Sequence, residues 1–268
     1  MKEGNTMTKK ALMTVISLLA SASFILCQTP GARIIDMTYA YDQNTIYWPT
    51  AREFRLEKLG WGVSNGGWWY ASNEYGASEH GGTHADAPIH FAAKGRTMDQ
   101  VLIEEWIGPA VRIDVTGKCA GNRDYCLTAA DIEGWEREHG RVPDGAWVIM
   151  YTGIGTQYYP DKKKVLGTDK RGDAALPELS FPGFSPESVE FLLSQRNIKG
   201  IALDTPSIDA GKRTDFKVHQ VLCAAGKLAL ENIANLDKLP AAGATLYVIP
   251  MLIKDGTGSP ARVFAVIR

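Results

Sequence analysis

Short runs of β-branched and aromatic residues recur along the chain, separated by polar or glycine-rich segments. Such runs predict strands, because branched and aromatic side chains suit a pleated, half-buried surface. The predicted strands cover residues 33–39, 110–115, 146–151, 198–203, 245–251 and 262–267.

Helices are predicted between some of these strands. Thr128 and Asp131 have the spacing of a capping box before residues 132–138, since each side chain can bond the backbone N–H of the other. Ser185 and Pro186 form a strong helix start before residues 189–195, because proline fits the first helical position. Strands that alternate with helices indicate an α/β fold, and we see a single domain.

The charged segment 161–173 lacks periodicity and is expected to be a solvated loop, a basic binding patch being the weaker interpretation. The formal net charge of the whole chain is −1. A nearly neutral chain gives no electrostatic reason to expect nucleic acid or an anionic membrane as a partner. The expected ligand is therefore a small molecule.

The first residues have the pattern of a targeting signal. Lys9 and Lys10 precede an apolar run over residues 11–26, which suits a secretory signal peptide covering residues 1–27. An uncleaved anchor is the alternative. We therefore expect a mature domain of residues 28–268 in a secreted or extracytoplasmic location.

An oxidising compartment changes the interpretation of the cysteines. Cys119 and Cys126 flank a polar loop, so we expect them to form a disulfide, with two free surface thiols as the alternative. Cys223 lies in an apolar run and is expected to be a buried free thiol.

Three of the five histidines fall between His80 and His90, together with Asp86. Imidazole and carboxylate suit Zn²⁺ or Mn²⁺, and the absence of cysteine argues against a closed structural zinc site. The glycines and Pro88 oppose a helix, so we expect a turn followed by extended chain. In extended chain His84 and Asp86 share a face with His90, and a Gly-Gly turn brings in His80. Unrelated surface or core histidines are the alternative.

The run from His80 to His90 resembles the signature of the metal-dependent cyclase family, which includes bacterial kynurenine formamidases and isatin hydrolases. Residues 35–38 resemble the family's first strand, and residues 201–209 resemble a second family segment. His219 and Glu231 match the family's later metal-binding pair. The resemblance covers essentially everything after the N-terminal segment. It implies a swivelling β/β/α fold and a homo-oligomer.

The resemblance also implies the roles of the site residues. His80, His84, Asp86, His219 and Glu231 would bind one or two divalent ions, Zn²⁺ or Mn²⁺, and His90 would be the general acid/base. His90 could instead be a ligand. Without the resemblance, the segments around His219 and Glu231 are expected to be helical, and both would be solvated or capping residues. Water activated by such an ion could hydrolyse an amide without a serine or cysteine nucleophile.

Aromatic residues gather just before the histidine cluster. We expect Trp68 and Trp69, with Trp61, Tyr70 and Tyr75, to wall an aryl-binding pocket, core packing or an oligomer interface being the alternative. N-formylkynurenine and isatin both present an aryl ring beside an amide carbonyl. The expected function is therefore amide hydrolysis of the kynurenine formamidase (arylformamidase) type, in tryptophan catabolism. An isatin hydrolase-type cyclic amidase and a secreted, non-catalytic metal-binding protein are the alternatives.

Overall fold

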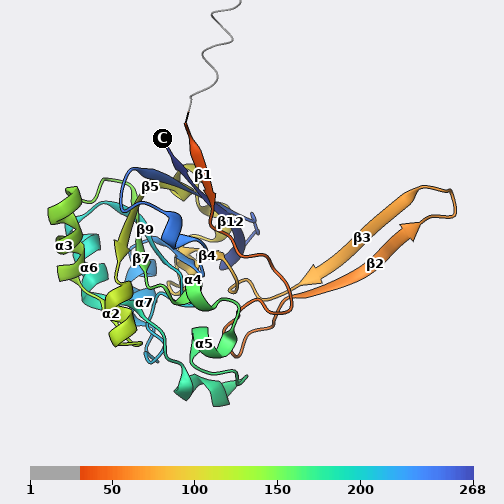
Figure 1. The fold of residues 1–268 in the computed structure, drawn as a ribbon, viewed down its shortest axis with the longest axis horizontal. Coiled ribbons are helices and arrows are strands. Elements are labelled where there is room, and N and C mark those ends of the chain that lie inside the picture. Colours follow the sequence, from red (N-terminus) through yellow and green to blue (C-terminus); the bar gives the residue numbers. More distant parts are fainter. Residues whose placement is uncertain (1–30) are drawn as a thin grey trace, which may run out of the picture. The chain divides into compact units, whose positions relative to one another are not determined.

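A computed structural model describes residues 31–268, and residues 34–267 form the compact unit analysed below. Its main element is an eight-stranded sheet that curls round until two of its strands meet (Figure 1). The additional pairing of β12 with β4 closes the sheet into a barrel and leaves β1 outside the ring. In spatial order the strands are β1 (Arg33–Asp36), β12 (Gly258–Ile267), β11 (Ala244–Pro250), β5 (Ile107–Asp114), β7 (Ala146–Tyr151), β9 (Ile198–Leu203), β10 (Leu228–Glu231) and β4 (His84–Asp86).

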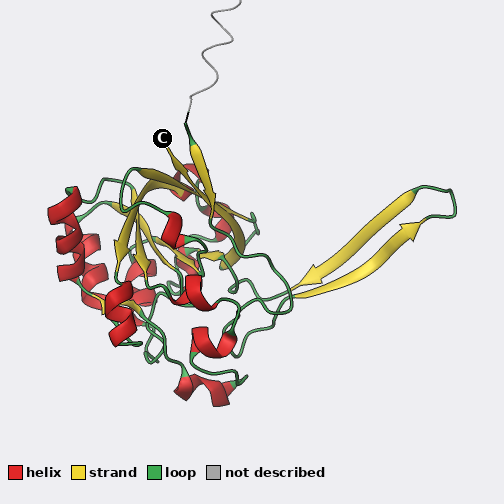
Figure 2. Ribbon diagram, viewed as in Figure 1, coloured by secondary structure: helices red, strands yellow, loops and turns green. Residues whose placement is uncertain are grey.

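Helices and two small sheets surround the barrel (Figure 2). The small sheets pair β2 (Arg55–Val63) with β3 (Trp69–Gly76) and β6 (Cys126–Leu127) with β8 (Gly183–Phe184). The α-helices are α2 (Thr116–Gly121), α3 (Ala129–His139), α4 (Ile154–Tyr158), α5 (Lys162–Leu166), α6 (Pro186–Gln195) and α7 (Lys217–Ala224). The 3-10 helices are η1 (Pro88–His90), η2 (Met98–Gln100), η3 (Ile103–Trp106), η4 (Asp173–Glu178) and η5 (Leu236–Lys238).

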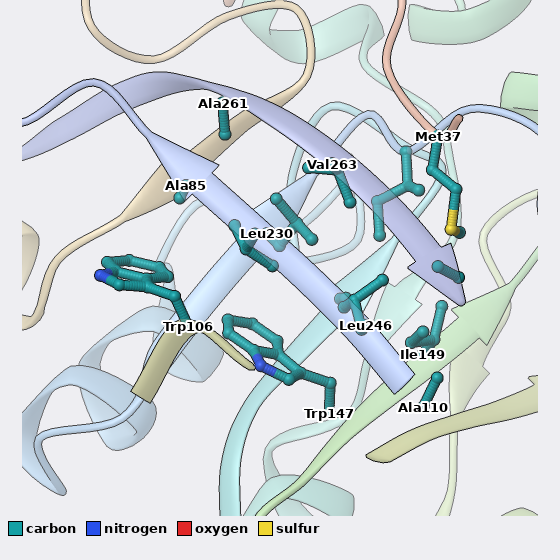
Figure 3. Close-up of a cluster of buried hydrophobic side chains, with 14 of the residues drawn as sticks. Met37, Ala85, Trp106, Ala110, Trp147, Ile149, Leu230, Leu246, Ala261 and Val263 are labelled. Carbon is teal, nitrogen blue, oxygen red and sulfur yellow. The ribbon is translucent and has the colours of Figure 1, made fainter. Parts of the chain in front are cut away.

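Strand alternation divides the hydrophobic core into two layers. On β7, Trp147 and Ile149 face the barrel interior, whereas Val148 and Met150 belong to the cluster that the helices cover. Figure 3 shows the inner cluster, where the Trp106 ring stacks beside that of Trp147 with the ring centroids 6.2 Å apart. Both faces of the parallel strands are thus buried, which explains why these strands are continuously apolar in the sequence.

The α/β prediction is confirmed, as are all six predicted strands, with shifted ends for four of them. Both predicted helices also form where their caps indicated. The Thr128 hydroxyl accepts a hydrogen bond from Asp131 N, and an Asp131 oxygen accepts one from Thr128 N. The Ser185 hydroxyl accepts from Ser188 N at the start of α6.

Two local predictions are wrong. The segment 161–173 is not simply a loop, because Asp161 caps the short helix α5 by accepting a hydrogen bond from Lys164 N. Cys119 and Cys126 are free thiols and form no disulfide in this structure. Cys119 lies in α2 and its side chain is buried in the outer core, whereas Cys126 begins β6. Cys223 is a buried free thiol, as expected.

The predicted signal sequence lies outside the described residues. Within residues 31–268, no helix has both the length and the apolar character that crossing a membrane would require.

Candidate metal centre

The candidate site is assembled around the short strand β4, which closes the barrel. β4 pairs with β10 so that His84 lies opposite Glu231, and it pairs with β12 so that Asp86 lies opposite Gly258. Directly opposed residues of antiparallel strands point to the same face. This register therefore places the Glu231 carboxylate beside the His84 imidazole, although 146 residues separate them in the sequence.

Glycines make room for the histidine at position 80. The turn before β4 passes through Gly82, whose φ of +58° is in the left-handed region that glycine tolerates best. At Gly258, an added Cβ would lie only 2.4 Å from Cε1 of His80. A side chain at either glycine would displace the chain or the ring, so both glycines help place His80 beside Asp86.

Three imidazoles and two carboxylates converge at one point. His84 Nε2 lies 3.4 Å from Asp86 Oδ1 and 3.3 Å from Glu231 Oε2. His219 Nε2 lies 3.5 Å from Asp86 Oδ2 and 3.3 Å from Glu231 Oε1. His80 Nδ1 lies 2.7 Å from Asp86 Oδ1. The five residues that the family resemblance implied as ligands are thus brought together.

In His84 and His219, the ring nitrogen that points away from the centre, here called the outer nitrogen, has a hydrogen-bond partner that fixes the ring. His84 Nδ1 lies 3.0 Å from the carbonyl oxygen of Gly82, and His219 Nδ1 lies 2.7 Å from Asp209 Oδ2. Because these partners accept hydrogen bonds, the outer nitrogens must be the donors. In a neutral imidazole the inner nitrogen then keeps its lone pair, as in a metal-binding histidine.

The tautomer of His80 is set by two linked hydrogen bonds, through Thr257 to Glu79. The Thr257 hydroxyl donates its only proton to Glu79 Oε2, at 2.5 Å. It can therefore only accept from His80 Nε2, 2.8 Å away. The neutral form of His80 consequently presents the lone pair of Nδ1 to the centre of the site.

These residues fit a divalent cation. Three nitrogen lone pairs and two carboxylates face one another, and the buried atoms His84 Nε2 and Asp86 Oδ2 have no hydrogen-bond partner among the described residues. Buried polar groups are normally paired, so such atoms call for a further partner. Imidazole and carboxylate donors are those of Zn²⁺ and Mn²⁺ sites.

The electrostatics show how strongly the site attracts positive charge. Burial alone would lower the pKa of His84, but the contact with Asp86 and the charges of Asp86 and Glu231 outweigh burial and raise this pKa to about 9. Burial alone would raise the pKa of Asp86, yet the neighbouring histidines hold it well below its usual range. Protons therefore compete with a metal for these positions.

His90 lies beside this cluster but in a conformation that differs from the prediction. Extended chain was expected, whereas Pro88 starts the 3-10 helix η1, a position that suits proline. The helix places the His90 ring in a stack on His80, with the ring centroids 3.8 Å apart. Burial lowers the pKa of His90 to about 3. The His90 imidazole that faces the site is therefore neutral, and its nitrogen is also close enough to Asp86 and His219 for metal binding.

A cavity of about 200 Å³ opens onto these groups. Its walls are apolar, and Trp48, Phe91 and Phe216 form a continuous aromatic surface with centroid separations of 5.7 Å and 5.6 Å about Phe216. Phe216 has a φ of +48°, which is unusual for a bulky residue and typical of functional sites. Among the residues that the structure describes, none that lines this cavity is a lysine or arginine.

Sequence reasoning missed the aromatic walls and chose other residues in their place. Trp68 and Trp69, expected to line the pocket, are 59% and 61% exposed on the β2–β3 hairpin and do not line it. Among the described residues, β2 and β3 pair only with each other. The expected role of Trp68 and Trp69 in substrate binding therefore stays a prediction. Two of the observed wall residues could have been found from their closeness to the predicted site residues in the sequence. Phe91 follows His90, and Phe216 precedes His219 by three residues.

Glu231 also lies in different surroundings from those predicted. It ends strand β10 rather than lying in a helix. Asp209, which was not predicted as a site residue, accepts hydrogen bonds from the backbone N–H groups of Val218 and His219 as well as facing the His219 ring. It therefore fixes both the start of α7 and the orientation of the ring.

Comparison with known proteins agrees with this geometry. The Cyclase family model matches residues 35–210. An isatin hydrolase of Roseibium aggregatum is 36% identical over 208 residues, which cover 74% of this chain and 76% of that protein. A kynurenine formamidase of Bacillus cereus is 28% identical, over 87% of this chain and 96% of that protein. The solved structure of isatin hydrolase A from Labrenzia aggregata superposes with a TM-score of 0.79 at 36% identity, covering 96% of this chain and 99% of that one. The chain belongs to the cyclase family.

Proposed function

We propose that this chain is a metal-dependent hydrolase that opens the amide bond of a small, uncharged aryl amide of the isatin type. The observation that carries the proposal is the placement of the five-residue centre at the floor of an aromatic cavity. His84, Asp86, His219 and Glu231 with His80 would hold Zn²⁺ or Mn²⁺, as one ion or two. When bound, such an ion polarises a carbonyl and lowers the pKa of water.

The chain's own residues would divide the remaining tasks between them. The walls formed by Trp48, Phe91 and Phe216 would hold an aryl ring so that its amide carbonyl faces the buried carboxylates. His90, whose ring stacks on that of His80 beside the centre, would accept a proton from the attacking water. It would return that proton to the nitrogen as the carbon–nitrogen bond breaks, which leaves a carboxylic acid and an amine.

The charge of the cavity favours isatin over N-formylkynurenine. N-formylkynurenine carries an amino-acid carboxylate, and binding it in a buried site calls for a cationic partner. No lysine or arginine lines the described cavity, so only the metal centre itself could compensate that carboxylate, while isatin has no charge to compensate. The names of the relatives include both activities, so the kynurenine formamidase type is the alternative that an experiment must exclude.

The test is to measure ring opening of isatin and deformylation of N-formylkynurenine by the same metal-loaded protein. We expect a kcat/KM for isatin that exceeds that for N-formylkynurenine by at least about 10-fold, which corresponds to about 1.4 kcal/mol of discrimination. A preference for N-formylkynurenine would reassign the substrate. Bound metal with no turnover of either compound would support a non-catalytic metal-binding protein.

We also propose that residues 1–27 act as a signal peptide and that the mature chain works outside the cytoplasm. The support is the basic flank and apolar run in the sequence, which lie outside the described residues. Peptide mapping of protein from a secreting host should find no peptide from residues 1–27. Recovery of the intact N-terminus from the cytoplasmic fraction would contradict this.

A further inference from the structure

One buried polar side chain in the wall of the aromatic cavity has an atom without a partner. Ser207 and Asn232 are neutral polar residues that line this cavity. The Ser207 hydroxyl oxygen accepts a hydrogen bond from Asp209 N, whereas Asn232 Oδ1 is buried with no hydrogen-bond partner among the described residues. Asn232 as a whole is only 1% exposed. Because buried polar atoms are normally paired, Asn232 calls for a partner from outside the chain.

The backbone of Asn232 is held from both sides. Asn232 directly follows Glu231, the last residue of β10. Its N–H donates to the carbonyl oxygen of Thr205 at 3.0 Å, and its carbonyl oxygen accepts from the Thr83 hydroxyl at 2.7 Å. Its φ of +53° lies in the left-handed region, which asparagine tolerates better than most residues. Such a conformation, fixed by the surrounding structure, is typical of ligand-binding positions.

The asparagine amide offers two complementary groups on one edge of a planar unit. Its Oδ1 accepts hydrogen bonds and its Nδ2 donates them. A lactam presents the matching edge, because its ring holds the N–H and the carbonyl oxygen on the same side. An open-chain secondary amide is trans, which places these two groups on opposite sides. One asparagine can therefore bond both groups of a lactam, but only one of them in an open-chain amide.

We propose that Asn232 selects a cyclic amide as substrate: Oδ1 accepts the lactam N–H, and Nδ2 donates to the lactam carbonyl oxygen. This inference rests on the proposed function, because it names the substrate class of the same site. The aromatic walls recognise the aryl ring, and Asn232 adds recognition of the amide geometry. The carbonyl oxygen has two lone pairs, so one of them remains available to the metal centre. The bond to the N–H also holds the nitrogen in place for the proton that His90 returns to it.

The test measures binding of two lactams, oxindole and N-methyloxindole, to the metal-loaded protein by calorimetry. Both carry the aryl ring and the lactam of isatin but lack the ketone that activates isatin towards water. We expect the wild type to bind oxindole about 10–100-fold more tightly, because N-methyloxindole has no N–H to donate. Asn232→Gly should lower the affinity for oxindole to near that for N-methyloxindole.

Glycine is the appropriate replacement, because it adopts the φ of Asn232 without strain and keeps both backbone hydrogen bonds. The matched control is Asn235→Gly. Asn235 has a similar φ of +56°, but its side chain donates to the carbonyl oxygen of Asp36 at 2.7 Å and does not line the cavity. This control should bind both lactams as the wild type does. Circular dichroism and metal content should be unchanged in both variants.

Acetanilide tests the selection for a ring. Its amide is trans, so it can make one of the two hydrogen bonds with Asn232. Asn232→Gly should therefore weaken acetanilide binding by a smaller factor than oxindole binding. Equal weakening of the two would contradict selection for a lactam.

Other results of the binding experiment would overturn the proposal. One is a wild type that binds no oxindole or does not distinguish the two lactams. Another is Asn232→Gly with unchanged affinity for oxindole and a higher affinity for N-methyloxindole, which would mean that size alone excludes the methyl group. Loss of metal from Asn232→Gly would assign the side chain to the metal centre. Isatin hydrolysis on the same samples separates the two proposals: a wild type that opens isatin, with oxindole binding insensitive to Asn232→Gly, contradicts only the role of Asn232.

Discussion

The metal centre and the β2–β3 hairpin are neighbours in the sequence, but the rest of the chain holds the first in place and leaves the second exposed. Residues 80–90 carry groups whose positions are fixed by β10, β12 and the segment around Thr257. Residues 55–76 carry exposed aromatics held only by a hairpin ladder. The first region is held by several strands, whereas the second is a sheet of two strands that pair only with each other. Aromatic and histidine content alone does not reveal this difference, because the partners of each strand determine it.

The largest effect is expected at His84, whose side chain is buried in the metal centre. We expect His84→Ala to lose metal and to lower kcat/KM by at least about 10³-fold, because several kcal/mol of carbonyl activation depend on the ion. Metal analysis and isatin hydrolysis on the same sample measure both effects. His139→Ala is the matched control, since that ring lies at the end of α3. Retention of metal by the His84 variant would remove His84 from the ligand set.

His90 separates proton transfer from metal binding within the same cluster. His90→Ala should retain its metal and lose activity by about 10²–10⁴-fold, the usual contribution of general acid/base catalysis. The metal-to-protein ratio and kcat together measure this. A folded, metal-depleted variant would make His90 a ligand, and a variant as fast as the wild type would remove it from the mechanism.

The stability of the metal-free protein should depend on pH because of the histidines at the metal centre. Because His84 has a folded-state pKa of about 9 against an ordinary value of 6.5, its proton stabilises the folded apoprotein below pH 6.5. This contribution, at most about 3 kcal/mol, is lost as pH rises from about 6.5 to 9. His219, whose pKa is also raised, acts in the same direction.

Urea unfolding of chelated protein between pH 6 and 9.5 measures this effect. The metal-loaded protein is the control, since the ion replaces the proton and the slope should largely disappear. Apoprotein that is equally stable across this range, or more stable at high pH, would show that the carboxylates do not hold a proton on these rings.

The smallest effect is expected at Asp209, which touches the site only through His219. Asp209→Asn should weaken metal binding by about 10–100-fold, the usual range for a residue that orients a ligand. Competition with a chelator measures the affinity, and circular dichroism checks α7, which Asp209 also caps. Asp215→Asn, an exposed carboxylate that pairs with Arg213, is the matched control and should change nothing. Equal affinities in the two variants would limit Asp209 to capping the helix.

The sequence predicted the parts of this site that depend on local geometry. His84 and Asp86 share a face because they are two residues apart in a strand, and glycines beside His80 permit the turn. The cap residues likewise located α3 and α6. The buried strands were visible because both of their faces are apolar.

The remaining features depend on pairing between distant segments. Glu231 reaches His84 through strand register, which its own neighbours in sequence do not encode, and residue types alone favoured a helix there. The cavity walls come from Trp48, Phe91 and Phe216, which lie in three separate segments. The aromatic-rich hairpin was a more conspicuous signal, and its composition did not reveal that it leaves the body of the chain.

The central claim is that the five converging residues hold an ion that the reaction requires. The most direct test is to remove all metal, add back Zn²⁺ or Mn²⁺ in steps, and measure bound ion and isatin hydrolysis at each step. We expect no activity in the metal-free protein, followed by a rise in proportion to bound ion that saturates at one or two ions per chain. Full activity in protein verified to be metal-free would contradict the account.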